Sequence, residues 1–349
     1  MLTPILVAVM AIGLLLPAGA SAQAHAPAND PLSAAMLLLE ADPAKGVASL
    51  ERLSAAGDVE AKASLAMALG SELPGISVDR ERSKRLWEEA LAAGSQNARL
   101  YFGTQRLQND DLSDDETAVA LLQGLDDRFQ SAVAYPMGRA YLFGTGVEQD
   151  LARGSRLMKI AVEATPANSD AQFLLGRAYQ NGWGIPQDMP AAFMHLKIAA
   201  DAGDARAQWN VGMMLLDGEG VAADASQAYR YVRQAGEQGY EQGMISLAVM
   251  LALGQGVTPN PVEAREWYGR AASLGSAHAL RGLGMMMLVG EGGPSDPIVG
   301  AAMVEIAAEG GDSLAADLLQ QNSKAFADLP REQIDSVKSS WKQEFGSPR

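Results

Sequence analysis

The chain has 349 residues, with 42 acidic against 27 basic side chains, and its net charge at pH 7 is −15. This acidity excludes the broad basic patches with which proteins bind nucleic acids or anionic membrane surfaces. The chain contains no cysteine, which excludes a disulfide scaffold, a thiol nucleophile and a cysteine-ligated metal.

The N-terminus has the pattern of a signal peptide over residues 1–22. Residues 5–16 are apolar or glycine, a run too short to span a bilayer. Ala20-Ser21-Ala22 matches a small-residue cleavage site. No Lys or Arg precedes the apolar run, which keeps an uncleaved anchor and a misassigned start as alternatives. We expect export to the periplasm or the medium, and a mature chain without a transmembrane segment that begins with a linker over residues 23–31.

A unit of 36 residues is repeated four times between residues 168 and 311. Its clearest mark is a pair of glycines separated by one residue, and the pairs follow one another at steps of 36 residues. They are Gly182 and Gly184, Gly218 and Gly220, Gly254 and Gly256, and Gly290 and Gly292. A fixed period of this length is typical of a solenoid, in which each unit buries its apolar face against its neighbours.

The residues of one unit predict two helices joined by a glycine loop. Residues 205–217 carry apolar groups at helical spacing and predict a helix of about three turns. Gly218 and Gly220 end it, because glycine adopts positive φ without a steric penalty. Asp224 is then placed to accept hydrogen bonds from the free N–H groups of the second helix. The predicted buried stripe of that helix is Ala228, Tyr231, Val232 and Ala235.

The position of Asp224 recurs through the array. Asp188, Asp224, Asn260 and Asp296 each stand 15 residues before a glycine that closes the unit. The same spacing separates Asp42 from Gly57 and Asp79 from Gly94. We therefore expect the array to begin near residue 42, with a first half-unit helix over residues 32–40.

These features resemble the Sel1-like repeat family, which is related to tetratricopeptide repeats. One unit carries the family pattern in Ala205, Ala207, Gln208, Gly212, Gly218, Gly220, Val221, Asp224 and Ala228. The resemblance implies an all-α fold, a right-handed α-solenoid of helix-turn-helix repeats over residues 32–321. The pattern is broken over residues 95–130, which lack the glycine pair, at Thr165-Pro166 and at Gly293-Pro294. We expect altered loops at these places.

Residues 322–349 are expected to form a C-terminal capping helix and tail. After Pro330 the apolar side chains fall on one helical stripe, made of Ile334, Val337, Trp341 and Phe345. The opposite face is predicted to carry Arg331, Glu332, Asp335, Lys338 and Lys342. A solenoid needs a polar-backed cap on its last unit. An amphipathic helix for a membrane or a partner is the alternative.

The sequence offers little catalytic or metal-binding chemistry. The acidic segment 109–116 is dense in oxygen ligands but lacks the EF-hand spacing, so we interpret it as a solvated loop, with a calcium site as the alternative. His195 falls in register with Tyr231 and Trp267, a packing position, and His278 is at a variable helix start. Residues 339–342 match Ser-x-x-Lys without partner motifs. We expect no enzyme, cofactor, metal or small-molecule ligand.

A candidate partner surface follows from the variable positions of the first helices, which usually line the concave face of stacked helix pairs. Residues four apart share a helix face, so the two variable positions of each helix form one strip. The strip consists of Tyr135 and Arg139, Phe173 and Arg177, Trp209 and Met213, Ile245 and Val249, and Arg281 and Met285. Aromatic, Arg and Met residues are enriched at protein interfaces. The alternative is that these side chains pack between adjacent units.

The resulting hypothesis is an exported, non-enzymatic scaffold or adaptor that binds a protein or peptide on this strip. The family resemblance implies roles of this kind in envelope assembly, exopolysaccharide export, signalling or host contact. A polysaccharide-binding protein, with the aromatic residues as a stacking platform, or an envelope hydrolase is the rival class. A hydrolase needs two convergent carboxylates, whereas the repeats place Asp at helix caps.

Overall fold

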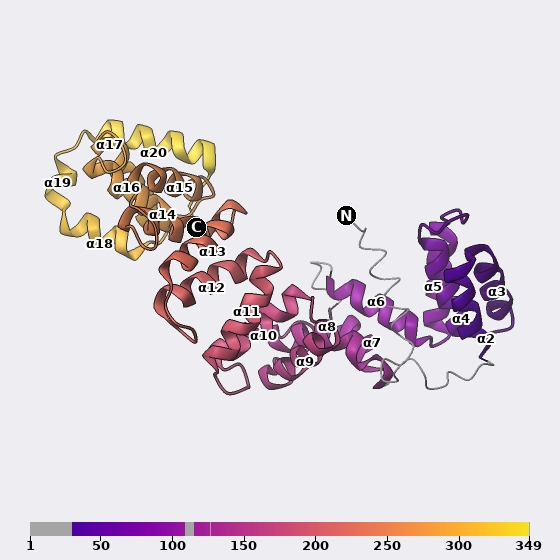
Figure 1. The fold of residues 1–349 in the computed structure, drawn as a ribbon. Coiled ribbons are helices and arrows are strands. Elements are labelled where there is room, and N and C mark those ends of the chain that lie inside the picture. Colours follow the sequence, from indigo (N-terminus) through magenta and orange to yellow (C-terminus); the bar gives the residue numbers. More distant parts are fainter. Residues whose placement is uncertain (1–29, 109–114, 126, 349) are drawn as a thin grey trace. The chain divides into compact units, whose positions relative to one another are not determined.

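The computed structural model describes residues 30–108, 115–125 and 127–348. Throughout these residues the regular secondary structure is helical, with no strand (Figure 1). The chain divides into two compact units, residues 1–165 and 166–349, which are described separately. The predicted signal peptide, the linker up to residue 29 and the acidic residues 109–114, with the calcium alternative that rests on them, lie outside the described residues.

The first unit is a succession of antiparallel helix pairs in which α2 packs on α3, α4 on α5 and α8 on α9. Helix α2 covers the half-unit helix predicted over residues 32–40. The elements of the unit are α2 (Pro31–Ala41), α3 (Pro43–Ala55), α4 (Val59–Gly70), α5 (Arg80–Ala92), α6 (Gln96–Gln108), α7 (Asp115–Gln123), the short 3-10 helix η2 (Asp127–Phe129), α8 (Gln130–Phe143) and α9 (Leu151–Ala164).

The second unit contains the four regular repeats and the C-terminal cap. Each helix packs against the next one along the chain from α10 to α18, and the predicted helix over residues 205–217 is α12. The elements are α10 (Ser169–Asn181), α11 (Met189–Asp201), α12 (Ala205–Asp217), α13 (Ala225–Glu237), α14 (Glu241–Leu253), α15 (Pro261–Ser273), α16 (Ala277–Val289), α17 (Pro297–Glu309), α18 (Ser313–Gln321), α19 (Ser323–Ala327) and α20 (Arg331–Phe345). The alternating α-hairpins confirm the predicted α-solenoid.

The two glycines of a loop have different tasks. Gly218 ends α12 with a φ of 74°, in the left-handed region, where a side chain would be strained. Gly220 also has positive φ, and a Cβ atom added to it would lie 2.3 Å from the carbonyl oxygen of Met189, at the start of α11. The second glycine therefore lets this loop touch the backbone of the preceding repeat, and Gly256 and Gly292 make the equivalent contacts. Asp224 caps α13 as predicted, with its carboxylate accepting from the N–H of Gln227 at 2.9 Å.

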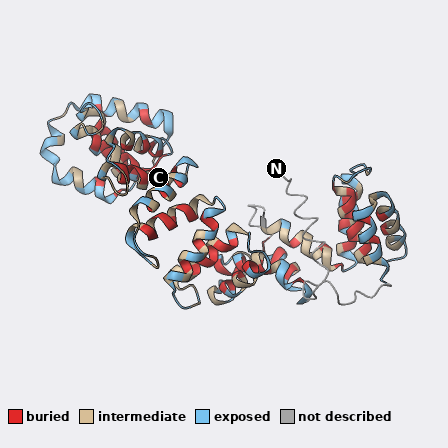
Figure 2. Cartoon of the chain, in the orientation of Figure 1, coloured by how far each residue is buried: buried red, intermediate tan, exposed pale blue. Residues whose placement is uncertain are grey.

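The core is formed by buried residues of consecutive helices, which are coloured red on the ribbon in Figure 2. In the second unit it extends without a break from Ala192 to Trp341. Of the stripe predicted for α13, Ala228, Val232 and Ala235 are fully buried. Tyr231 is only half-buried, since its hydroxyl donates to Asp201 at 2.7 Å near the surface.

Helix α20 covers the end of the array and packs on α17, as a capping helix should. Ile334 and Trp341 are buried, whereas Phe345, at the end of the predicted stripe, is 38% exposed. The prediction that Lys338 faces away from the repeats is wrong. Its side chain is only 12% exposed, because its ammonium group lies between Glu305 and Glu309 of α17, at 2.8 and 2.6 Å. The short helix α19 was not predicted.

The boundary between the units falls where the sequence departs from its period. Thr165 ends α9 with φ of −139° and ψ of 80°. A proline disfavours helical dihedrals in the residue before it, so Pro166 explains this extended ending in place of a glycine cap.

Candidate protein-binding surface

The second unit carries eight residues of the predicted strip on the first helices of its four repeats, α10, α12, α14 and α16. We call these eight the first-helix strip. Seven of them are half-buried and Met285 is 43% exposed. The members are Phe173, Arg177, Trp209, Met213, Ile245, Val249, Arg281 and Met285. Tyr135 and Arg139 lie on α8 of the first unit, where the Arg139 guanidinium is 5.9 Å from the centre of the Tyr135 ring. Their continuity with the other eight stays a prediction.

The guanidinium of Arg177 links α10 to α12. Its Nη1 donates to Asn210 at 3.0 Å and to Gln180 at 3.2 Å. Asn210 is only 5% exposed, and its own amide donates to the carbonyl oxygen of Arg206 at 2.7 Å. A buried amide with both ends bonded is held in one orientation, so it fixes the guanidinium that it contacts.

A second arginine, Arg206, lies across the same two helices. It forms ion pairs with Asp204 at the start of its own helix and with Asp170 of α10, the latter at 2.6 Å. Its guanidinium also lies 4.3 Å from the centre of the Phe173 ring, a cation–π contact. The hydrogen bond with Asp204 is the main reason that the pKa of Arg206 is raised further above its ordinary value. Phe173 is therefore covered from one side by the neighbouring repeat.

Trp209 connects α12 to α14. Its indole N–H donates to the Ser246 hydroxyl at 2.9 Å, and its ring lies 6.1 Å from the ring of Tyr240. Burial raises the pKa of Tyr240, and the nearby positive charges of Arg206 and Arg177 offset part of this increase. Tyr240 occupies the N-cap position of α14 without making a side-chain cap.

Arg281, at the other end of the strip, is held by Asp312. The Nε–H group of Arg281 donates to both carboxylate oxygens of Asp312, at 3.0 and 3.2 Å, and the Asp312 side chain is 1% exposed. A buried carboxylate needs such a partner, so Arg281 has a structural role between the last repeat and α18. Between the two ends the strip is aliphatic, with Met213, Ile245 and Val249 half-buried.

The strip thus joins adjacent repeats and also leaves part of each side chain at the surface. The Arg177 and Trp209 side chains bond to the next repeat, as the packing alternative predicts, and partner binding on the strip stays a prediction. Sequence reasoning missed Asn210, Arg206 and Tyr240. A signal for Tyr240 was available, since the equivalent positions hold the capping residues Asp204 and Ser276.

The polar side chains that could suggest catalysis have structural partners. His195 stacks on Tyr179 at 5.6 Å and bonds to Gln172 at 2.7 Å, in the packing position predicted for it. The Ser339 hydroxyl donates to the carbonyl oxygen of Asp335, one turn back in α20. Nowhere in the described part of the chain do three His, Asp or Glu side chains converge as metal ligands. Nor does any described helix have the length and apolarity needed to cross a membrane.

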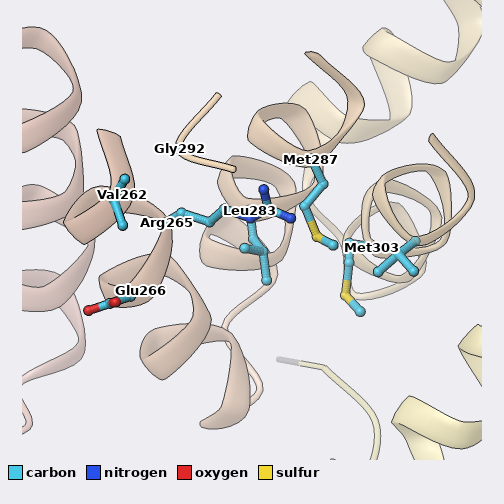
Figure 3. Close-up of a pocket in the computed structure, with 8 residues that line it drawn as sticks. Val262, Arg265, Glu266, Leu283, Met287, Gly292 and Met303 are labelled. Carbon is cyan, nitrogen blue, oxygen red and sulfur yellow. The ribbon is translucent and has the colours of Figure 1, made fainter. Parts of the chain in front are cut away.

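A shallow pocket of about 420 Å³ lies between α15 and α17, is also lined by Leu283 and Met287 of α16, and was not predicted. Figure 3 shows Val262, Arg265 and Glu266 of α15 on one side, with Met287 and Met303 on the other. In the repeat register, Arg265 stands 36 and 72 residues after Tyr229 and Phe193, so an arginine replaces an aromatic residue here. Its guanidinium donates to the carbonyl oxygen of Pro294 at 3.2 Å.

Comparison with known proteins gives a consistent result. A model of the Sel1 repeat family matches six segments that together make up more than half of the chain, residues 59–95, 131–165, 169–204, 205–240, 242–276 and 277–312. No curated protein matches the chain. Among solved structures, a Sel1 repeat protein from Oxalobacter formigenes is 24% identical, with a TM-score of 0.58 over 70% of this chain and 99% of its own.

Two further solved structures are more distant. The protective antigen c5321 of uropathogenic Escherichia coli is 17% identical, with a TM-score of 0.39 over 90% of this chain and 84% of its own. The immunity protein Pa5087 of Pseudomonas aeruginosa is 20% identical, with a TM-score of 0.37 over 64% of this chain and 84% of its own. The repeat period, the paired-glycine loops and the family match all agree: this chain belongs to the Sel1 repeat family, whose members generally mediate protein–protein interactions.

Proposed function

We propose that this protein is an adaptor that binds a protein or peptide partner along the first-helix strip of the second unit. The observation that carries the proposal is the composition and exposure of the strip. It combines Trp, Phe, Arg and Met side chains, the types enriched at interfaces, on helices held in register by cross-repeat bonds. A rigid surface binds more tightly because less side-chain freedom is lost on association.

The distribution of contacts supports a peptide lying across several repeats. Arg177 is fixed by Asn210 and Trp209 by Ser246, so two successive first helices hold these side chains in place before a partner binds. Met213, Ile245 and Met285 supply an adaptable apolar surface between and beyond those anchors. An extended partner with apolar residues would place them there.

The experiment uses two methionines with similar exposure on opposite sets of helices. Met285 in α16 belongs to the strip and is 43% exposed, whereas Met194 in α11 lies outside it and is 52% exposed. Each is replaced by Glu in the chain that starts at Gln23, and the proteins are used to capture partners from solubilised envelope. We expect Met285→Glu to lose a partner that wild type and Met194→Glu retain, with equal melting temperatures for both variants.

Retention of every captured protein by Met285→Glu, together with loss by Met194→Glu, would contradict the proposal and favour the second helices. A polysaccharide ligand is the rival outcome. Its signature is binding to an oligosaccharide array that Trp209→Ala abolishes, in a preparation that captures no protein.

We also propose that the chain is exported, from the apolar run over residues 5–16 and the Ala20-Ser21-Ala22 site. N-terminal sequencing of the protein from its bacterial host should begin at Gln23. A sequence that begins at Met1 in the cytoplasmic fraction would overturn this proposal.

A further inference from the structure

Arg177 differs from the other arginines of the strip region in its partners. Arg206 bonds to Asp170 and Arg281 to Asp312. Within the described ranges, no carboxylate lies within ion-pair distance of the Arg177 guanidinium, and its bonds go to the neutral amides of Gln180 and Asn210. The charge of Arg177 is therefore not paired with a described carboxylate of this chain, and an anionic group of a ligand can pair with it.

The geometry leaves one edge of this guanidinium available. Both of its hydrogen bonds are donated by Nη1, and no group in the described part of the chain accepts a hydrogen bond from Nε or Nη2. A guanidinium has five N–H donors, and a pair of them on one edge matches the two oxygens of a carboxylate. Asn210, itself buried and bonded to Arg206, holds that edge in place before any ligand arrives.

Tyr240 supplies a second donor close by. Its ring lies 6.1 Å from the ring of Trp209, and the next residue of α12, Asn210, holds the Arg177 guanidinium. No described residue forms a hydrogen bond with its hydroxyl. The position otherwise holds capping residues, Asp204 and Ser276 in the neighbouring repeats. Helix α14 therefore lacks a side-chain cap and has an aromatic ring beside Trp209 at this position. Departures from local preferences such as helix capping are common at functional sites.

We propose that Arg177 and Tyr240 form a carboxylate-binding subsite of the first-helix strip, which takes an acidic group of a bound peptide. The peptide carboxylate accepts from Nε and Nη2 of Arg177 and from the Tyr240 hydroxyl. An apolar peptide residue next to it lies against Trp209 and Met213. This inference rests on the proposed function, since it specifies the partner for the same surface.

The test is a selection of random peptides, displayed with either a free or a blocked C-terminus, on the chain that starts at Gln23. Selected peptides are synthesised and their affinities measured for wild type, Arg177→Gln and Arg230→Gln. Arg230 is the matched control, because it is an exposed arginine on the second helix α13. Each peptide is also made with its acidic residue amidated, which leaves the protein unchanged and removes any doubt about folding.

The subsite predicts that selected peptides share an acidic group. Arg177→Gln and amidation of that group should each weaken binding about 10- to 100-fold. When the two changes are combined, the loss of affinity should be no larger than for either change alone. Arg230→Gln should bind like wild type. If blocking the C-terminus of the peptide lowers its affinity, the bound group is the terminal carboxylate. If Glu→Gln or Asp→Asn in the peptide lowers the affinity, the bound group is that side chain.

Two results would overturn the inference in distinguishable ways. Peptides that depend on Trp209 or Met285, but carry no common acidic group and ignore Arg177→Gln, would refute the subsite and leave the adaptor function standing. Peptides that ignore every substitution in the first-helix strip would refute the subsite and the proposed function together.

Discussion

Replacement of Gly256 by Ala is expected to disrupt the junction between two repeats. Gly256 is the second glycine of the loop after α14, with a φ of 72°. An added Cβ atom would lie 1.9 Å from the carbonyl oxygen of Ala225, at the start of α13. No flexible side chain is involved in this overlap, so two backbone segments must move apart.

The expected cost has two parts. Left-handed dihedrals cost a residue with a Cβ about 1–2 kcal/mol. Forcing extra volume into a closed contact costs about 1–3 kcal/mol more. Gly239→Ala provides the matched control, because Gly239 has a φ of 85° and an added Cβ atom would meet nothing within 4 Å. The control should therefore show the dihedral cost alone.

Urea denaturation followed by circular dichroism measures both variants beside wild type. We expect Gly256→Ala to lower the free energy of unfolding of the second unit by about 2–5 kcal/mol. Gly239→Ala should lower it by about 1–2 kcal/mol. Equal effects of the two substitutions would refute the reasoning, since they would show that the loop does not press on the preceding repeat.

Three further predictions concern caps. Trp341→Ala should lower the stability of the second unit by about 3–5 kcal/mol in thermal or urea melts, because the ring is 7% exposed; a change below about 1 kcal/mol would contradict the capping role of α20. Burial alone would raise the pKa of Glu305, but hydrogen bonds from Arg331 and Lys338 outweigh it, and the pKa lies below its ordinary value. This stabilisation is present above the unfolded pKa of about 4.3 and is lost as the pH falls through the lower folded pKa. Glu305→Gln should flatten the acid limb of a stability–pH curve, and an unchanged limb would count against it. Asn260→Ala, which removes the N-cap of α15, should cost about 1 kcal/mol in the same melts, whereas Asn260→Asp should keep the cap, lose only the amide's hydrogen bond to Glu263 and cost less.

The regular part of the fold could be predicted from the sequence because the same residue type ends or caps the corresponding helix every 36 residues. The glycine at 218 and the aspartate at 224 act through their own backbone dihedrals and nearest N–H groups, which a local pattern records. The contact of Gly220 with Met189 also repeats with the period, although its reason becomes visible only when two repeats are in place.

Features that depend on contacts made only once in the chain could not be predicted from the repeat pattern. Lys338 looked solvent-facing on its own helix, and only the position of Glu305 and Glu309 across from it accounts for its burial. The pocket beside Arg265 is lined by residues of three helices, whose relative positions the periodicity of one helix does not give.

The candidate site shows the same limit. The strip was identified from helical spacing alone, and spacing cannot separate a side chain that bonds to the next repeat from one that faces a partner. Arg177 and Arg281 both belong to the strip, Arg177 at the second position of its pair and Arg281 at the first. Asp312 engages one of them, whereas the other contacts only neutral amides among the described residues. The difference lies in residues outside the strip.

Hydrogen–deuterium exchange of the chain with and without a captured partner tests the central proposal most directly. We expect slower exchange on binding in the first helices, α10, α12, α14 and α16, with the largest effect around Arg177 and Trp209. Protection confined to the second helices, α11, α13, α15 and α17, would contradict the assignment of the binding surface.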